Sequence, residues 1–218
     1  MPAPSSKKPT ALRVLDAAED LFAERGYAAT SLGDVADRVG VRQPSLYNHF
    51  KSKQHLYECV LERLLDPFLE MMEAVVLDVG KHERSEKLIA EIMNHAVQQP
   101  NVARLIQHAV LTGDTQMDLI VERWLEPVVE RGQVLLEAVP EVDGAEEAAE
   151  FSARVVMAFN SLMLGYVTLA PLHKRLLGIE PLEPQSTQRH IDLLVRFWAA
   201  LWNHSPESSQ GTEIHLSF

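Results

Sequence analysis

Four basic side chains stand close together in a segment that has no acidic residue. Between Arg38 and Tyr57 the cations are Arg38, Arg42, Lys51 and Lys53, although the whole chain of 218 residues has a formal net charge of -11. Local potential, more than overall charge, decides where phosphate groups bind. Four cations alone more often form a solvated helix face. The segment therefore predicts contact with phosphates only if it belongs to a nucleic-acid-binding motif.

Side chains that could support catalysis or bind a metal are scattered along the sequence. Cys59 is the only cysteine, which excludes an internal disulfide and a zinc site built from cysteines. Neither His95 nor His108 belongs to a His-x-x-x-His or His-x-x-Glu pair, so binding of a metal or a ligand carboxylate is the weaker alternative for both. We expect no catalytic residues, no metal and no cofactor. A redox role for Cys59 is a further weak alternative, because lone buried thiols are mostly inert.

The elements that position the basic segment are predicted to be helices. Nearly every periodic stretch follows helical spacing, and no alternating strand of useful length occurs, so we predict an all-α chain. A first helix starts at Thr10 as its cap and stops at Gly26. Ser52 caps a long helix in which Pro67 predicts a kink or a boundary.

Between these two helices lies the pattern of a helix, a tight turn and a helix. Ser31 is a good cap for a short helix, with Asp34 three residues later. Gly40 permits a left-handed turn, and Pro44 suits the first turn of a third helix, which ends at Phe50. Residues 31–50 thus predict a helix-turn-helix.

The rest of the chain continues in the same helical period. Pro127 predicts a bend near Glu126, residues 141–147 read as an acidic connection and residues 178–184 as a proline-punctuated loop. The further helices are predicted over 84–98, 101–112, 115–138, about 145–170 and about 186–204.

Targeting signals are not evident in the sequence. The first ten residues contain no apolar run that could serve as a secretion signal, so we expect a cytoplasmic protein. The charge-free stretch Val155–Leu172 has 18 residues, but it contains Asn160, Ser161 and Thr168. We therefore expect a buried helix there and no membrane span.

The stretch from Thr30 to Leu56, TSLGDVADRVGVRQPSLYNHFKSKQHL, resembles the DNA-binding signature of the TetR family of bacterial transcriptional regulators. The resemblance covers roughly residues 10–57, about a quarter of the chain. It implies a flexible arm (1–9), a three-helix DNA-binding domain (10–57), a larger helical ligand-binding and dimerisation domain (58–204) and a polar tail (205–218). The preceding helix contributes the family's pattern at Ala17, Ala18, Leu21, Phe22, Gly26 and Tyr27.

Base contacts are expected from the third helix, because a helix-turn-helix places its second helix in the major groove. Arg42 and Gln43 are long hydrogen-bonding side chains that can reach guanine or adenine edges, and Ser45 and Asn48 follow on the next turn. Ordinary helix surface is the alternative. Arg42 and Pro44 depart from the turn of many relatives, so no base preference can be transferred.

Phosphate contacts are implied by the resemblance at four further positions. Tyr47 and His49 lie near the end of the third helix, Lys53 begins the fourth, and Thr30 precedes the second. For Tyr47 a place in the core is an alternative, although its ring and its hydroxyl could serve both roles.

The larger half is implied to bind a small effector and to dimerise, with its last two helices pairing across a twofold axis. We predict a homodimeric regulator of double-stranded operator DNA, a repressor that a small apolar or amphipathic molecule releases from a palindromic site. The alternative is a helical small-molecule-binding protein or enzyme in which DNA binding is secondary.

Candidate residues for these two roles come from helix faces. For each pocket candidate taken separately, a place in the plain core is the favoured alternative. The interface candidates are the seam positions Leu162, Gly165, Leu194, Trp198 and Trp202. The pocket candidates are Met72, Ile92, Met93, His95, Leu105, His108, Trp124, Leu125, Met163 and Tyr166.

Overall fold

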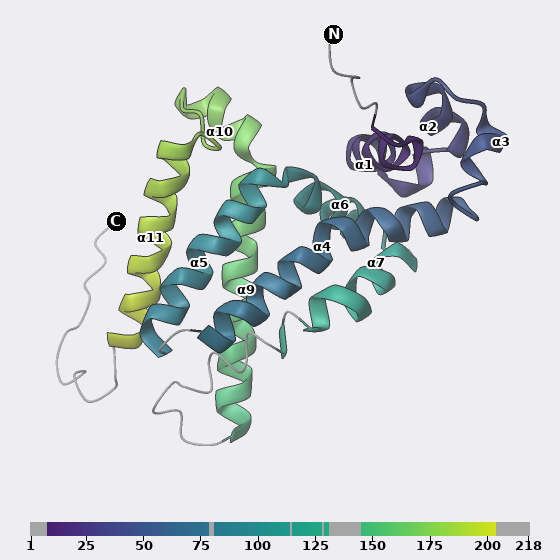
Figure 1. Cartoon of the computed structure of the whole chain (residues 1–218). Helices are drawn as coiled ribbons and strands as arrows, with labels where there is room; N and C mark the ends of the chain where they lie inside the picture. Colours follow the sequence, from purple (N-terminus) through teal and green to yellow (C-terminus); the bar gives the residue numbers. More distant parts are fainter. Residues whose placement is uncertain (1–7, 79–80, 114, 128, 131–144, 204–218) are drawn as a thin grey trace, which may run out of the picture.

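The computed structural model describes residues 8–78, 81–113, 115–127, 129–130 and 145–203, and all secondary structure in these ranges is helical. The all-α prediction is confirmed. Helices α1 to α3 form one end of the molecule, α5 and α9 to α11 the other, and α4 runs between them (Figure 1). The elements are α1 (Thr10–Ala29), α2 (Leu32–Val39), α3 (Gln43–Leu46), α4 (Lys53–Asp78), α5 (Lys81–Gln98), α6 (Pro100–Thr112), α7 (Thr115–Ile120), the π-helix η1 (Val121–Leu125), α9 (Ala145–Thr168), α10 (Ala170–Leu177) and α11 (Pro184–Asn203).

Helix α2 has both of the terminal signals that its sequence predicts. The Asp34 N–H donates to Ser31 Oγ at 3.1 Å, and the Ser31 N–H donates to Asp34 Oδ2 at 2.8 Å, which completes a capping box. At the other end Gly40 has φ 73° and ψ 40°, the left-handed conformation that residues with a Cβ seldom adopt. The capping box fixes the start of α2, and the left-handed Gly40 turns the chain from α2 toward α3.

Helix α3 is shorter than predicted, because it ends at Leu46 and not at Phe50. The N–H groups of His49 and Phe50 both donate to the Leu46 carbonyl, at 2.9 and 2.8 Å. Since two donors share one acceptor, the hydrogen-bond ladder does not advance, and residues 47–49 form a turn.

Helix α1 is interrupted at the glycine that was predicted to stop it. Gly26 has φ 79° and ψ 169°, and the chain regains helical geometry only for the last residues up to Ala29. The Thr30 hydroxyl donates to the carbonyls of Gly26 and Leu21, at 2.9 and 3.2 Å, so these acceptors keep partners. Thr10 is the first helical residue and makes no side-chain cap bond, so its predicted capping role is wrong.

Helix α4 begins as predicted, because the His55 N–H donates to Ser52 Oγ at 3.0 Å. It continues through Pro67 to Asp78, so no helix boundary occurs at the proline. One helix therefore connects the two ends of the molecule.

The predicted bend near Glu126 takes the form of a π-helical turn. The Glu126 N–H donates to the Val121 carbonyl, one residue further back than in an α-helix. Pro127 follows directly, and a proline has no N–H and crowds the carbonyl four residues before it, which disfavours α-helical register here. Residues 131–138 of the predicted helix 115–138 lie outside the described residues.

Near the end of the chain the structure contains one helix that the sequence reading missed. Helix α10 (Ala170–Leu177) follows α9 after a break at Leu169, whose φ and ψ are -91° and 1°. Pro171 in its first turn and Gly178 at its end are ordinary helix signals, but the sequence analysis predicted no helix between residue 170 and the loop at 178–184. The predicted arm up to residue 7, the connection at 141–144 and the tail from residue 204 lie outside the described residues.

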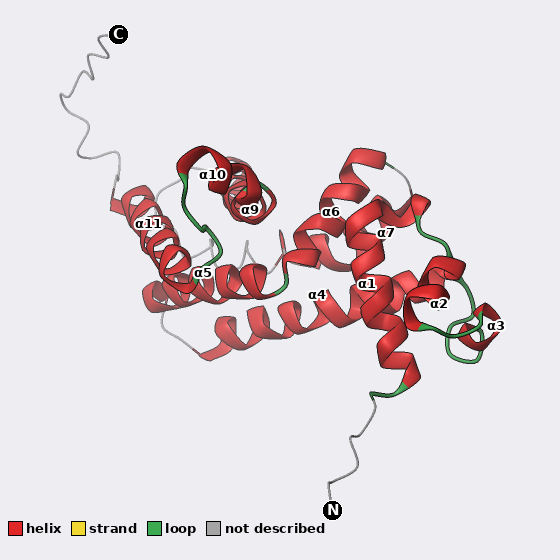
Figure 2. Ribbon diagram, turned by 90° about the horizontal axis from the view of Figure 1, so that it is seen from above, coloured by secondary structure: helices red, strands yellow, loops and turns green. Residues whose placement is uncertain are grey.

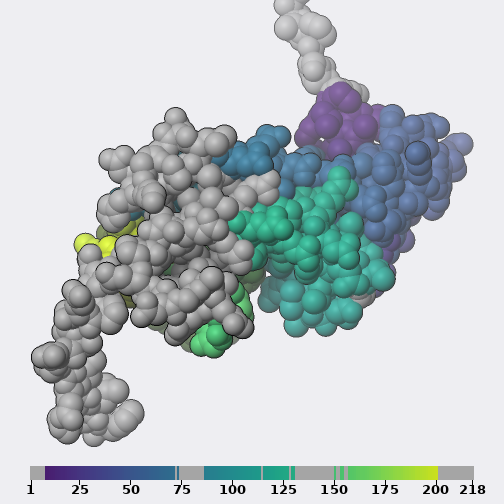
Figure 3. All heavy atoms as spheres, turned by 90° about the horizontal axis from the view of Figure 1, so that it is seen from below, coloured from purple at the N-terminus to yellow at the C-terminus, as the bar shows by residue number. Residues whose placement is uncertain are grey.

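Apolar packing continues from the three N-terminal helices into the larger half. Val14, Phe22 and Leu46 belong to the same buried cluster as Leu105 of α6 and Trp124 of η1. The view from above shows α6 and α7 beside α1 (Figure 2), and the view from below shows their teal surface continuous with the blue surface of the N-terminal helices (Figure 3). No helix among the described residues is long and apolar enough to cross a membrane.

Two glycine substitutions test the local geometry of the N-terminal helices. We expect Gly40→Ala to lower the free energy of unfolding by about 1 kcal/mol, because a Cβ there would meet no atom within 4 Å and only the left-handed backbone resists it. Gly26→Ala should cost about 3 kcal/mol, since its backbone region is almost restricted to glycine and a Cβ would lie 3.1 Å from His108 Nδ1. Urea unfolding measures both.

The steric part of the Gly26 effect is separable. In a His108→Ala background the loss caused by Gly26→Ala should shrink by about 1 kcal/mol, while the loss caused by Gly40→Ala should stay the same. Equal losses for the two alanine variants in the parent protein would contradict this account.

Candidate DNA-binding surface and effector region

The predicted base-contacting residues lie on an exposed edge of the N-terminal helices. Arg42, Gln43 and Asn48 are exposed, and Ser45 is half-buried. Leu46 and Phe50 point the other way, into the core, as predicted. The buried Leu46 thus anchors α3 while its polar neighbours keep contact with solvent, so the surface can approach base edges.

The residues predicted to contact phosphates differ in their exposure to solvent. Tyr47 and His49 are exposed, so the core alternative for Tyr47 does not hold. Thr30 is only 2% exposed, and its hydroxyl is donated to the Leu21 and Gly26 carbonyls. Any contact of Thr30 with a phosphate stays a prediction that this hydrogen bonding does not favour.

Lys53 is tied to the end of α1. Its Nζ lies 4.2 Å from the centre of the Tyr27 ring and donates to the Ala28 carbonyl at 3.3 Å. Partial burial lowers the pKa of its ammonium. The side chain therefore reinforces the junction of α1 and α4 at the place where the resemblance puts a phosphate contact.

Salt bridges and hydrogen bonds join the N-terminal helices to the larger half. Arg63 of α4 pairs with both Asp16 and Glu19 of α1, the former at 2.8 Å. Asn101 Nδ2 of α6 donates to the same Glu19 carboxylate at 2.9 Å. Three helices thus converge on one acidic side chain that is only 14% exposed.

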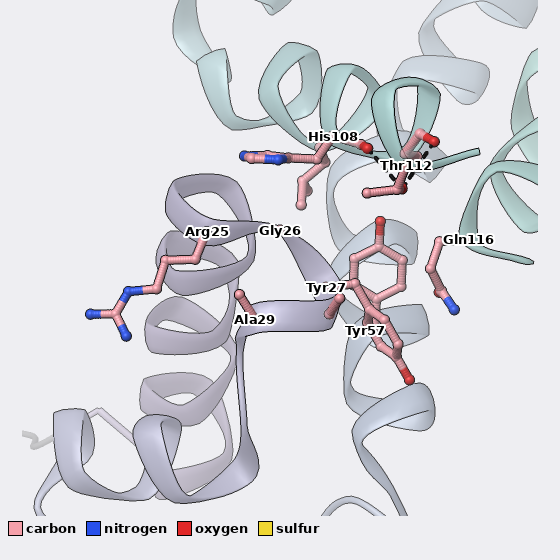
Figure 4. A pocket seen from close by; sticks show the side chains of 11 residues that line it. Arg25, Gly26, Tyr27, Ala29, Tyr57, His108, Thr112 and Gln116 are labelled. Atoms are coloured by element: carbon pink, nitrogen blue, oxygen red, sulfur yellow. Dashed lines mark hydrogen bonds between the residues drawn. The ribbon is translucent and has the colours of Figure 1, made fainter. Parts of the chain in front are cut away.

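A small cavity lies at the same junction. It measures about 90 Å³ and is lined from α1 by Arg25, Gly26 and Tyr27, and from α6 by His108 and Thr112 among others. Figure 4 shows His108 above Gly26, with Tyr57 and Gln116 on the other side of the cavity. A drug-sized ligand needs roughly 300 Å³ or more, so this space is too small for such an effector.

The ten predicted pocket residues do not surround a single space. Leu105, Trp124 and Leu125 belong to the core that is shared with the N-terminal helices, and His108 lines the small cavity. The side chain of Met72 lies outside the description. The remaining candidates on α5 and α9 pack with α11 or beside α4, namely Ile92, Met93, His95, Met163 and Tyr166.

Cys59 gives no support to the redox alternative. Its Sγ lies 3.6 Å from His55 Nε2, but burial and the nearby carboxylates of Glu62 and Glu58 raise the pKa of the thiol. The reactive species is the thiolate, which this environment disfavours. The described residues include no group of three or more metal-binding side chains.

Comparison with known proteins identifies the N-terminal helices. Residues 14–60 match the family model described as bacterial regulatory proteins, tetR family. The match is confined to these 47 residues, which therefore form a DNA-binding domain similar to that of the tetR family. Along 54 residues the chain is 48% identical to the HTH-type transcriptional activator FasR of Mycolicibacterium smegmatis, and the match covers 25% of each protein. The chain therefore matches only a quarter of the length of this relative.

Solved structures extend the likeness to the whole fold. A transcriptional regulator from Aquifex aeolicus superposes with a TM-score of 0.67 at 20% identity, over 88% of this chain and 99% of that one. The regulator FadR from Bacillus subtilis, in complex with stearoyl-CoA, has a TM-score of 0.62 at 17% identity, over 84% and 97%. These similarities show that the larger half also has the architecture found in TetR-type regulators.

The predicted dimer-interface residues divide between surface and core. Leu162 is exposed, and nothing lies within 4 Å of a Cβ built on Gly165, so both keep their predicted role. Leu194 and Trp198 face inward and pack with Met93 of α5, so their assignment to the interface is wrong. The side chain of Trp202 lies outside the description.

A different apolar row of α11 is exposed. Leu193 and Phe197, one turn apart, are 44% and 50% exposed, and α9 exposes Met157 in addition to Leu162. Adjacent positions of a helix point about 100° apart, so Leu193 and Leu194 face different surroundings. The row predicted from the sequence is the one that is buried within the protomer, and the row of Leu193 and Phe197 is exposed.

Two charge substitutions on α11 distinguish the rows. We expect Leu194→Asp to abolish folding, because it places a carboxylate at a fully buried position. Phe197→Asp should leave the circular dichroism spectrum and the melting temperature of the helices nearly intact and should produce a monomer in sedimentation velocity. A folded Leu194→Asp variant, or a Phe197→Asp variant that stays dimeric, would contradict the assignment.

Proposed function

We propose that this protein is a homodimeric, operator-binding transcriptional repressor of the TetR type, which a small apolar or amphipathic molecule releases from DNA. The observation that carries the proposal is the exposed polar edge formed by Arg42, Gln43 and Asn48, at and around helix α3, whose Leu46 is buried. The left-handed Gly40 at the end of α2 turns the chain toward α3. A rigid element with exposed donors and acceptors is what direct reading of base edges requires.

The twofold pairing of two such surfaces is supported by the larger half. The exposed side chains of Leu193 and Phe197 on α11, together with Met157 and Leu162 on α9, form apolar surface that a second copy would cover. With both protomers on one face of DNA, two recognition helices about 34–36 Å apart would read a palindrome.

Effector binding is supported by the composition of the helices beyond α4. Apolar side chains from α5, α9 and α11 form one cluster, and Leu88 of α5 packs with Phe68 and Met71 of α4 in another. These surroundings suit an apolar ligand. The FadR structure, similar in fold, holds stearoyl-CoA.

Coupling between the two ends would run through α4. Its first residues include Lys53, which contacts α1, and its second half presents Phe68 and Met71 to α5. Arg63, between them, is paired with Asp16 and Glu19 of α1. A ligand that displaces the second half of α4 would therefore move the N-terminal helices as well.

An enzyme is the weaker candidate. A helical enzyme needs an activated nucleophile with its base, or a metal set. Cys59 lies beside His55, but burial and nearby carboxylates raise the pKa of its thiol. The described residues include no group of three or more metal-binding side chains. Turnover of a bound small molecule by the purified protein would support an enzymatic function.

DNA binding has a test that distinguishes base contacts from phosphate contacts. A palindrome selected from random duplexes serves as the probe, and fluorescence anisotropy measures affinity for it and for each single-base-pair variant. Gln43→Ala should relax the preference at one or two base pairs by about 1–3 kcal/mol. Lys53→Ala should weaken binding to all sequences alike and lower the slope of log affinity against log salt by about 1.

Arg175→Ala serves as the matched control, because this exposed cation lies on α10, far along the chain from the N-terminal helices. It should change neither quantity. The reverse pattern, with specificity lost in Lys53→Ala and kept in Gln43→Ala, would overturn the assignment of roles, and failure to enrich any palindrome would overturn the proposed function.

Effector release is tested by linkage. A ligand that converts nearly all dimers to the inactive form must prefer that form by about 10⁴-fold, roughly 5.5 kcal/mol, which burial of some 200 Å² of apolar surface could provide at about 25 cal/mol per Å². Operator DNA must then weaken binding of the ligand by the same factor. Calorimetric titration of a compound found by thermal-shift screening, with and without operator, measures that factor, and equal affinities in the two titrations would contradict the mechanism.

A further inference from the structure

One polar group lies in the apolar seam between α4 and α5. His95 is on α5, one turn after Ile92, and its ring centre is 5.4 Å from that of Phe68 on α4. Ile92 and Phe68 both pack with the buried Leu88. An imidazole in these surroundings needs partners for two ring nitrogens, one of which donates and one of which accepts when the ring is neutral.

Only one of the two nitrogens of His95 has a partner among the described residues. Nε2 is buried without any hydrogen-bond partner, and the Leu64 backbone favours the protonated form of the ring. We therefore assign the side of the ring near Leu64 to Nδ1, which carries the proton when it faces a carbonyl. Burial lowers the pKa of the imidazole, so the ring is neutral near pH 7. Nε2 then presents a lone pair with no donor opposite it.

A buried acceptor without a donor is an unusual feature in a native structure. The group that would complete it is an uncharged hydrogen-bond donor, such as a hydroxyl. A carboxylate would place its own lone pairs against that of Nε2, and protonation of the ring, which would relieve this repulsion, is opposed by burial. Met71, next to Phe68 in the same cluster, is a flexible side chain that can make room for a ligand.

We propose that Nε2 of His95 accepts a hydrogen bond from a hydroxyl group of the effector, so that the protein selects a neutral apolar alcohol over a carboxylate of the same chain length. This inference rests on the proposed function for the presence of an effector. It reverses the earlier expectation that His95 would bind a carboxylate or a metal, if it bound a ligand at all.

Three probes with the same apolar chain test the selection: 1-decanol, decyl methyl ether, which has an oxygen but no donor, and decanoate at pH 8. Isothermal titration of the full-length protein gives the three affinities. Decanol should bind about 3- to 10-fold more tightly than the ether, the value expected for one hydrogen bond, and more tightly than decanoate. Decanoate binding as tightly as decanol, or absence of binding by decanol up to its solubility, would overturn the proposal.

Variants then locate the effect. His95→Phe should bind the alcohol and the ether equally, because its ring has the size of imidazole without the acceptor. His95→Gln, which retains an acceptor, should keep part of the preference. The matched control is His190→Phe, since His190 also has a buried Nε2 without a described partner but stacks on Tyr166 of α9, away from α4. A preference that survives in His95→Phe, or that disappears in His190→Phe instead, would overturn the assignment to His95.

A measurement without ligand checks the protonation on which the argument depends. Nitrogen-15 NMR of the histidine rings should show His95 as the Nδ1–H tautomer at pH 7, with Nε2 as an acceptor. The Nε2–H tautomer, in which the ring would face Phe68 as a donor, would overturn the proposal. Selection of a palindrome by the DNA assay is independent of these results, so failure of the His95 site and failure of the proposed function give different outcomes.

Discussion

The structure depends on one continuous apolar core that α1, α4 and α6 build together. Phe22 and Val14 of α1 share this core with Leu105 of α6 and Trp124 of η1. Small domains of fewer than about 60 residues bury too little surface to be more than marginally stable by themselves. The N-terminal helices therefore gain part of their stability from the larger half, and any change in α6 reaches the surface that would contact DNA.

Polar contacts and one close approach of a side chain to the backbone add to the apolar packing where α1, α4 and α6 meet. Gly26 has no Cβ, which allows the His108 ring to approach the backbone of α1 closely. Arg63, Glu19 and Asn101 connect α4, α1 and α6. Each of these partly buried contacts contributes modest free energy, but together their geometry restricts the ways in which α1 can shift over α4. Apolar packing thus gives the junction its stability, and the polar contacts select one arrangement of the helices.

At the other end of the molecule, helix α11 packs with only one of its two apolar sides. Helix α11 has two apolar rows, one that contains Leu194 and Trp198 and one that contains Leu193 and Phe197. The first row is covered by α5 and α9 of the same protomer, and the second is exposed. A helix that is apolar on two sides is typical of an element that is buried on both sides in an assembly.

The sequence alone determined the features that depend on a few neighbouring residues. The capping box of Ser31 and Asp34, the left-handed Gly40 and the cap at Ser52 require only local hydrogen bonds and local backbone preferences, so their prediction was confirmed. Tertiary structure decided the features that depend on distant partners. The inward row of α11 is set by α5 and α9, and the Thr30 hydroxyl is occupied by carbonyls that the break at Gly26 leaves available. The packing of α4 against α5 likewise leaves Nε2 of His95 without a hydrogen-bond partner. A sequence specifies the donors and acceptors of each residue, but only the packed helices determine which donor meets which acceptor.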